Sequence, residues 1–121
     1  MVKFTIPISP VSKKNSQQIV RSKNGRPFII PSEKYKEYEK DAARFIPKVT
    51  TIDRTVNVKA TFYMPTHRRV DLVNLQEALL DVLVKYRLLD DDDSRIVVSM
   101  DGSRVEYDKD NPRTEVEITE V

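Results

Sequence analysis

Hydrophobic and polar residues alternate strictly between positions 55 and 64. Apolar side chains take every second place, at Val56, Val58, Ala60, Phe62 and Met64, and Pro65 ends the run. A period of two is typical of a strand with one buried face, so this segment is the clearest predicted strand. Shorter strands are predicted at residues 2–7, 27–30, 96–100, 104–107 and 113–121, and we expect Val116 and Ile118 of the last one to face the core.

Two other segments have a helical period. Four residues recur at helical spacing and share one face, namely Tyr35, Tyr38, Ala42 and Phe45. We interpret their aromatic rings as core and not as base-stacking surfaces, and Ser32 is a candidate cap for this helix. Residues 71–86 predict a second helix, which is apolar around most of its girth and should therefore be largely buried.

These elements predict a single α+β domain over residues 1–121, with the approximate order βαβαββ. Its two main helices should pack on one face of a mixed sheet. The Asp101-Gly102 pair is expected to turn the chain back from the strand at 96–100 into the strand at 104–107. A length of 121 residues leaves room for one modest core.

Polar residues form one narrow stripe on the second helix, at Asp71, Asn74, Glu77, Asp81 and Lys85. Spacings of three and four residues keep them on the same side of a helix. Four consecutive carboxylates, Asp90 to Asp93, follow this helix, and we expect them to fold back to the same end of the sheet as some of the helix acids. Clustered carboxylates without His or Cys neighbours favour a hard cation such as Mg²⁺ or Mn²⁺.

Each of these acidic features also has a purely structural interpretation. The aspartate run is compatible with a solvated turn or a helix-ending loop, and Asp81 with an (i, i+4) ion pair to Lys85. An EF-hand loop is excluded, because its alternating oxygen ligands, central glycine and terminal glutamate are absent.

Composition narrows the class of protein. The chain is 39% hydrophobic and 33% charged and has no cysteine, which excludes disulfides and thiolate metal sites and argues against zinc. Its apolar stretches fall far short of the roughly 20 residues of a membrane span, and the amino terminus lacks a signal-peptide core. We therefore expect a soluble intracellular protein without a membrane partner.

Charge is segregated along the chain, although the net charge is only +2. No acidic residue precedes Glu33, and residues 9–25, rich in Pro, Ser, Asn and Lys, predict a long irregular loop. The basic residues of this opening stretch are Lys3, Lys13, Lys14, Arg21, Lys23 and Arg26, and His67-Arg68-Arg69 adds a second basic point before the acidic helix. Phosphate contacts on one surface and metal-binding carboxylates on another would produce this pattern, whereas a solvated basic loop is the alternative.

Several of these motifs together resemble the RusA-like family of Holliday-junction resolvases. The central ones are Arg68-Arg69-Val70-Asp71-Leu72-Val73-Asn74-Leu75, then Asp81, then Asp91-Asp92 before Ser94-Arg95-Ile96. The resemblance covers nearly the whole chain, because Ile6-Pro7 with Ser12-Lys13-Lys14-Asn15 is similar to the family's basic opening loop (residues 8–26 here) and residues 35–45 to its first helix. Asp101-Gly102-Ser103-Arg104 and Pro112-Arg113-Thr114-Glu115 resemble features of a phage or prophage branch, which implies action in the cytoplasm of a bacterial host.

The resemblance implies a homodimeric, Mg²⁺-dependent endonuclease that cuts four-way junctions and related branched DNA by paired nicks. Asp71 would be a catalytic metal ligand, and Asp91 or Asp92 a second one, with Asp92 favoured and the register open by one residue. Asn74 would support the site. Phosphates would be held by the basic residues Lys13, Lys14, Arg21, Lys23, Arg26, Arg68 and Arg69. His67 is interpreted as a phosphate donor, a general acid or a plain surface residue.

Two positions depart from the best-known form of the family motif. Val73 stands where that form has a second aspartate, and Glu77 where it has a lysine. Glu77 lies one turn before Asp81, so this pair would restore the lost negative charge at the metal. A catalytically degenerate module that binds branched DNA without cutting it is the main alternative, and a structural protein with a stabilising cation is another.

Overall fold

The computed structural model describes residues 1–12, 17–21, 25, 27–31 and 33–121. Its centre is strand β4 (Val56–Met64), which pairs antiparallel with β7 (Arg113–Glu120), and β7 pairs antiparallel with β1 (Val2–Ile6). On its other side β4 pairs in parallel with both β5 (Val97–Ser99) and β6 (Arg104–Tyr107). The chain therefore forms a five-stranded mixed sheet, and the strictly alternating segment, predicted as a strand, is its central one.

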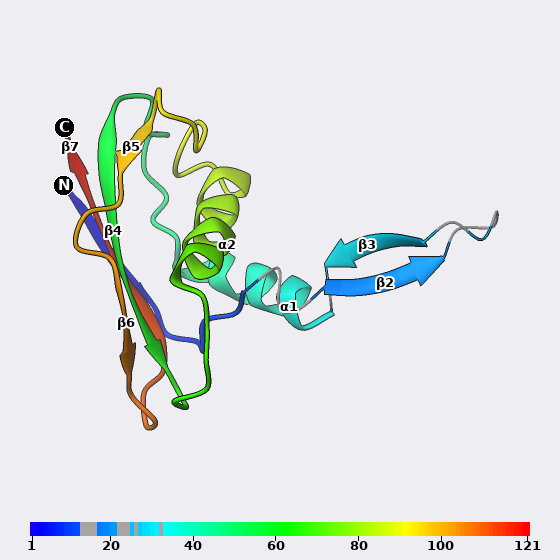
Figure 1. The fold of residues 1–121 in the computed structure, drawn as a ribbon. Coiled ribbons are helices and arrows are strands. Elements are labelled where there is room, and N and C mark those ends of the chain that lie inside the picture. Colours follow the sequence, from blue (N-terminus) through cyan, green and yellow to red (C-terminus); the bar gives the residue numbers. More distant parts are fainter. Residues whose placement is uncertain (13–16, 22–24, 26, 32) are drawn as a thin grey trace.

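Two helices cover one face of this sheet (Figure 1). Helix α1 (Glu33–Ala42) continues into the short 3₁₀ helix η2 (Ala43–Phe45), and α2 (Leu72–Lys85) follows β4. Alternate residues of β4 and β7 face the helices and build the core with α2, including Val58, Phe62, Val116, Ile118, Leu79 and Leu83. The predicted α+β fold, with its helices on one face of a mixed sheet, is confirmed.

The aromatic face predicted for the first helix is confirmed only in part. Tyr35, Tyr38 and Ala42 are buried, but Phe45 is 40% exposed. The α-helix ends at Ala42, and the tighter 3₁₀ turn that follows changes the angle between successive side chains. Phe45 consequently leaves the buried face, and Ile46 is buried in the core after it.

A separate two-stranded sheet replaces part of the predicted long loop. Strand β2 (Gln17–Arg21) pairs antiparallel with β3 (Pro27–Pro31), and this pair extends beyond α1, away from the main sheet (Figure 1). The expectation of an irregular segment at residues 9–25 was wrong for β2, because the β-branched neighbours Ile19 and Val20 promote a strand despite the polar residues around them. The predicted phosphate contacts Lys13, Lys14, Lys23 and Arg26, and the cap candidate Ser32, lie outside the described residues, and of Arg21 only the backbone is described.

Strands β5 and β6 do not form the predicted hairpin with each other. They follow one another along the same edge of β4, where Val97 is opposite Val56 and Arg104 is opposite Thr61. Asn57 stabilises the step between them, since its Oδ1 accepts hydrogen bonds from Ser99 Oγ (2.6 Å) and Asp101 N (2.8 Å). Gly102, at φ +86°, shifts the chain along β4 without reversing it.

Within the part of the chain that the structure describes, neither α-helix is long and apolar enough to cross a membrane.

The packing of α2 on the sheet gives a prediction about stability. Leu79 is completely buried, so Leu79→Ala should lower the free energy of unfolding by about 2–5 kcal/mol through lost burial and a residual cavity. Val73 lies on the same helix but is 64% exposed, and Val73→Ala should change this free energy by no more than about 0.5 kcal/mol. Urea denaturation of both variants measures the difference, and equal effects would contradict the placement of α2.

Candidate functional site

Asp71 begins helix α2 as its N-cap. Its backbone is extended (φ −93°, ψ 117°), and its Oδ1 accepts a hydrogen bond from the amide of Val73 at 2.9 Å. Aspartate is among the best residues for this position, because its carboxylate satisfies an amide that has no partner within the helix. The leading candidate metal ligand is thus an exposed carboxylate fixed at the start of a buried helix.

The other polar residues of the stripe follow along α2. Asn74 and Asp81 are half-buried and Glu77 is exposed. Ten residues separate Asp71 from Asp81, which at 1.5 Å per residue is about 15 Å along the helix axis. The ammonium of Lys85, the predicted alternative partner of Asp81, bonds to the Glu39 carboxylate of α1, and this contact raises the pKa of Lys85.

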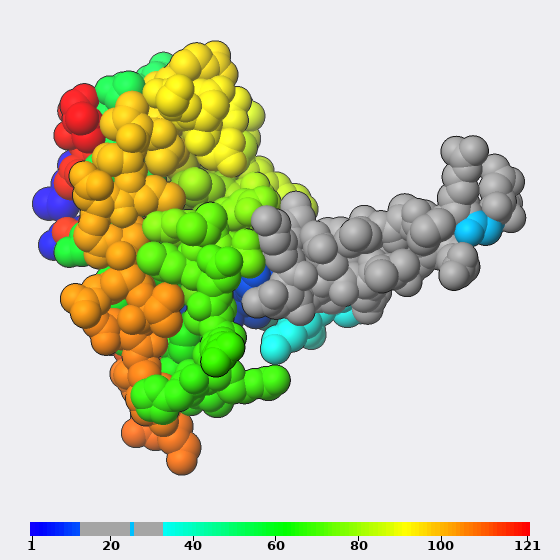
Figure 2. Space-filling view, viewed as in Figure 1, coloured from blue at the N-terminus to red at the C-terminus, as the bar shows by residue number. Residues whose placement is uncertain are grey.

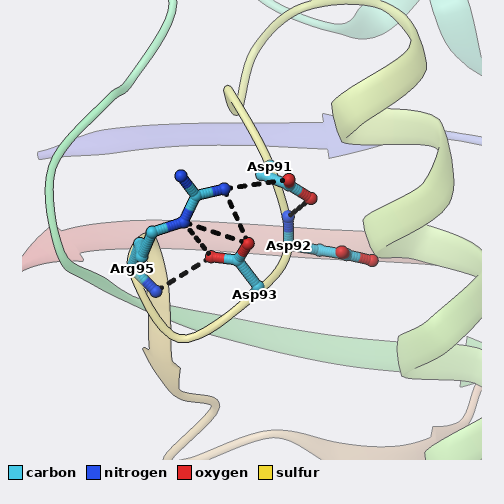
Figure 3. Close-up of polar contacts among 4 residues, drawn as sticks. All are labelled: Asp91, Asp92, Asp93 and Arg95. Carbon is cyan, nitrogen blue, oxygen red and sulfur yellow. Dashed lines mark hydrogen bonds and ion pairs between the residues drawn. The ribbon is translucent and has the colours of Figure 1, made fainter.

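Arg95 organises the aspartate run after α2. Its Nη2 lies 2.8 Å from Asp93 Oδ2 and 3.3 Å from Asp91 Oδ2, and its Nε donates to both Asp93 oxygens at 3.1 Å (Figure 3). These hydrogen bonds and the positive charge hold the pKa of Asp93 below its ordinary value. Arg95 therefore pairs with two of the four carboxylates in this loop.

Asp92 has the opposite environment. Figure 3 shows its side chain extending toward α2, away from Arg95. Although the residue is exposed, partial burial of its carboxyl, a hydrogen-bonding contact with Asp91 and the negative charges of Asp81 and Asp91 raise its pKa. Partial burial is the largest of these causes, and the negative charges of Asp81 and Asp91 add to it, so a bound cation would favour the ionised form of Asp92.

The candidate metal ligands thus lie in two groups. Asp92 interacts electrostatically with Asp81, so the aspartate run does fold back to one of the helix acids, as expected. Asp71 lies at the other end of α2 from this loop (Figure 1). Among the described residues of one chain, no three His, Cys, Asp or Glu side chains come together in a way that could hold a metal ion.

A basic groove of about 600 Å³ adjoins Asp71. It is formed by residues 9–12, by the start of α1 and by the loop after β4, and it contains three exposed cationic side chains, Lys34, Arg68 and Arg69. Val70 also lines it, and Asp71 is the next residue. The predicted contacts Arg68 and Arg69 therefore line a groove that ends, along the chain, at the residue before Asp71.

Lys34 was missed by the sequence reasoning. It lies in the first turn of α1, where a positive charge opposes the helix dipole. A lysine in such an unfavourable position was the available signal that it serves something other than helix stability. The structure also shows that Ser12, the residue before Lys13, lines the same groove.

The environments of Asp92 and Asp93 give a prediction about pH. Carboxyl-carbon NMR titration should place the pKa of Asp92 above and that of Asp93 below the ordinary value of 3.8. Arg95→Gln should raise the pKa of Asp93, because the favourable positive charge is gone. Asp81→Asn should lower the pKa of Asp92 and leave Asp93 unchanged. If Asp81→Asn has no effect on Asp92, the proximity of these two carboxylates is contradicted.

No curated protein matches the chain. A model of one protein family, described as endodeoxyribonuclease RusA, matches residues 7–119, which is almost the entire sequence. The matched span includes the basic groove, Asp71, the polar stripe of α2 and the aspartate run. The chain belongs to the RusA endodeoxyribonuclease family.

Proposed function

We propose that this protein is a Mg²⁺-dependent, homodimeric endodeoxyribonuclease that resolves four-way DNA junctions by a pair of symmetric nicks. The observation that carries the proposal is that Asp71 directly follows Val70, which lines the same groove as Lys34, Arg68 and Arg69. Cations of this kind bind the phosphodiester backbone whatever its sequence, and they would present a phosphate to the carboxylate.

The donor set suits a hard cation. Every candidate ligand is a carboxylate: Asp71, Glu77, Asp81, Asp91 and Asp92, with the Asn74 amide beside them. A cation there would offset the charges of Asp81 and Asp91, which add to the effect of burial on the pKa of Asp92. Arg95 is already paired with Asp91 and Asp93, which makes Asp92 the better ligand of the run. When bound, Mg²⁺, or Mn²⁺ in its place, would supply an activated water and stabilise charge on the phosphate oxygens.

The separation along α2 bears on the oligomeric state. Oxygen ligands of one Mg²⁺ lie at about 2.0–2.1 Å from the ion and therefore within about 4 Å of one another. Asp71 and the Asp81–Asp92 group of one chain are too far apart to share an ion, given the 14-residue length of α2. We infer that the dimer pairs Asp71 of one protomer with the Asp92 group of its partner. Two-fold symmetry then gives two sites, which matches two symmetric cuts in a junction.

A binding-only function is the second candidate, and Val73 favours it. This exposed valine stands where the best-known family motif has an aspartate, so one carboxylate of the usual set is missing. Glu77 is exposed on the same stripe, one turn before Asp81, and in the proposed enzyme it supplies the missing charge. Both candidate functions require the basic groove for DNA binding, so a cleavage assay is needed to distinguish them.

Cleavage can be measured on a labelled four-way junction and on a matched duplex, in Mg²⁺ and in EDTA. The protein should nick the junction in pairs only when Mg²⁺ is present. Asp71→Asn should slow nicking at least about 100-fold, since a metal ion held by carboxylates stabilises the transition state by several kcal/mol. Asparagine is as good an N-cap as aspartate, so α2 should remain intact.

Asp53→Asn is the matched control, because it makes the same chemical change at an exposed aspartate of the loop before β4. It should retain full activity. Tight junction binding with no cleavage in Mg²⁺ or Mn²⁺ would support the binding-only function instead. Equal nicking of duplex and junction would contradict junction selectivity.

A site shared between protomers should allow two inactive variants to complement each other. Asp71→Asn and Asp92→Asn should each be inactive alone, but a mixture allowed to exchange subunits should regain activity. In a mixed dimer one site contains both altered residues and the other contains neither. If each site were complete within one chain, every protomer of the mixture would be defective and no activity would return. Native mass spectrometry should confirm that mixed dimers have formed.

A further inference from the structure

Two aromatic rings stack on each other beside the basic groove. The ring centroids of His67, in the loop after β4, and Tyr107, at the end of β6, lie 3.8 Å apart with 30° between the ring planes. Figure 2 shows the orange surface of β6 against the green loop that follows β4, at the opposite end of this face from the yellow aspartate loop. Tyr107 is 44% exposed, so much of its ring surface faces solvent.

The two rings line a pocket of about 370 Å³. Its lining also includes the apolar residues Met64, Val70 and Val105 and the polar residues Thr66 and Arg68. Glu106 also lines the pocket, and its carboxylate is bonded to Arg104 at 2.6 Å, so its negative charge is partly compensated. Val105 and Tyr107 are two residues apart on one strand and therefore face the same side, so the pocket combines an aromatic and an apolar side chain of β6 with a largely polar surface.

The pocket adjoins the basic groove. Four residues line both of them, namely Met64, Thr66, Arg68 and Val70. A nucleotide whose phosphate is held by Arg68, Arg69 and Lys34 would therefore have its base next to the ring pair. Aromatic rings beside a cationic track are the usual combination in proteins that bind unpaired bases, since every base has a face that can stack.

We propose that His67 and Tyr107 form a stacking site for one unpaired nucleobase, occupied at the branch point of the DNA that this protein cuts. The proposal rests on the proposed function, because it assigns the selectivity for branched DNA to this pocket. In an intact duplex each base is already stacked and paired, so only a branch point, a flap or a single strand supplies a free base at low energy. The pocket would thus distinguish branched DNA from duplex, while the groove binds both.

The test measures binding in EDTA, so that it is independent of cleavage. The probes are a four-way junction, the same junction with abasic nucleotides at the four crossover positions, and a matched duplex. Tyr107→Ala should weaken binding to the normal junction about tenfold and leave duplex binding within about twofold, as expected for the loss of one stacked base. Tyr107→Phe should bind like the wild type, because the ring does the stacking.

The abasic junction isolates the base itself. The wild type should bind it about tenfold more weakly than the normal junction, and Tyr107→Ala should show no further loss on it, because the two changes remove the same contact. Independent, multiplicative losses would overturn the proposal, as would an equal loss of duplex binding.

His67→Ala lies in a loop, tests the second ring without altering a strand, and should show the same pattern. Phe45→Ala removes a similarly exposed ring outside the pocket and should bind normally. If the pattern holds but no Mg²⁺-dependent nicking occurs, the stacking site stands and the endonuclease proposal fails. If Mg²⁺-dependent nicking occurs but Tyr107→Ala and the abasic junction weaken binding independently, the endonuclease proposal stands and the stacking site fails.

Discussion

The burial of helix α2 against the sheet fixes the spacing of every residue that could carry chemistry. Leu75, Leu79, Val82 and Leu83 are almost fully buried along one side of this helix, so it cannot slide or tilt without opening the core. One end carries Asp71 as its cap. The other end continues into Leu88 and Leu89, which are also buried, and Leu89 forms a bridge with Ile52. The aspartate loop is therefore attached to the core on both sides, since Ile96 after it is buried as well.

Much of the fold follows from the pattern of the sequence. The alternation in β4 and the many apolar residues of α2 result from burial, whichever strands lie next to them. Both elements were therefore predictable. The positions of β5 and β6 were not, because Asp101-Gly102 is an ordinary hairpin signal and only the side chain of Asn57, 44 residues away, makes it a step along β4. Strand β2 was not predicted, because the polar residues around it obscured the strand signal of Ile19 and Val20; in the structure it pairs with β3.

The sequence predicts which side of α2 the candidate site residues lie on, but not how far apart they are along the helix axis. A helical projection puts Asp71, Glu77 and Asp81 on one stripe, but it contains no axial coordinate and hides the distance between the ends of α2. Nor does sequence reveal which aspartate of the run is available, because that depends on where the Arg95 guanidinium lies. The raised pKa of Asp92 and the lowered pKa of Asp93 come from the same loop with nearly the same sequence around them. Side-chain direction alone makes the difference.

The position of Tyr107 shows why a recognition surface would be built on this edge of the sheet. Its strand is paired with β4, and the next residue, Asp108, donates its amide to Met64 O at 2.9 Å. Arg113 binds the Asp108 carboxylate at 2.9 Å, which lowers the pKa of Asp108, and its guanidinium lies 3.7 Å from the centre of the Tyr63 ring. The backbone on both sides of Tyr107 is thus fixed by the paired strand and by the charged turn, so a base that stacks on this residue would not have to order the chain that carries it. Because binding then costs less conformational entropy, such a rigid edge serves recognition better than a mobile loop would.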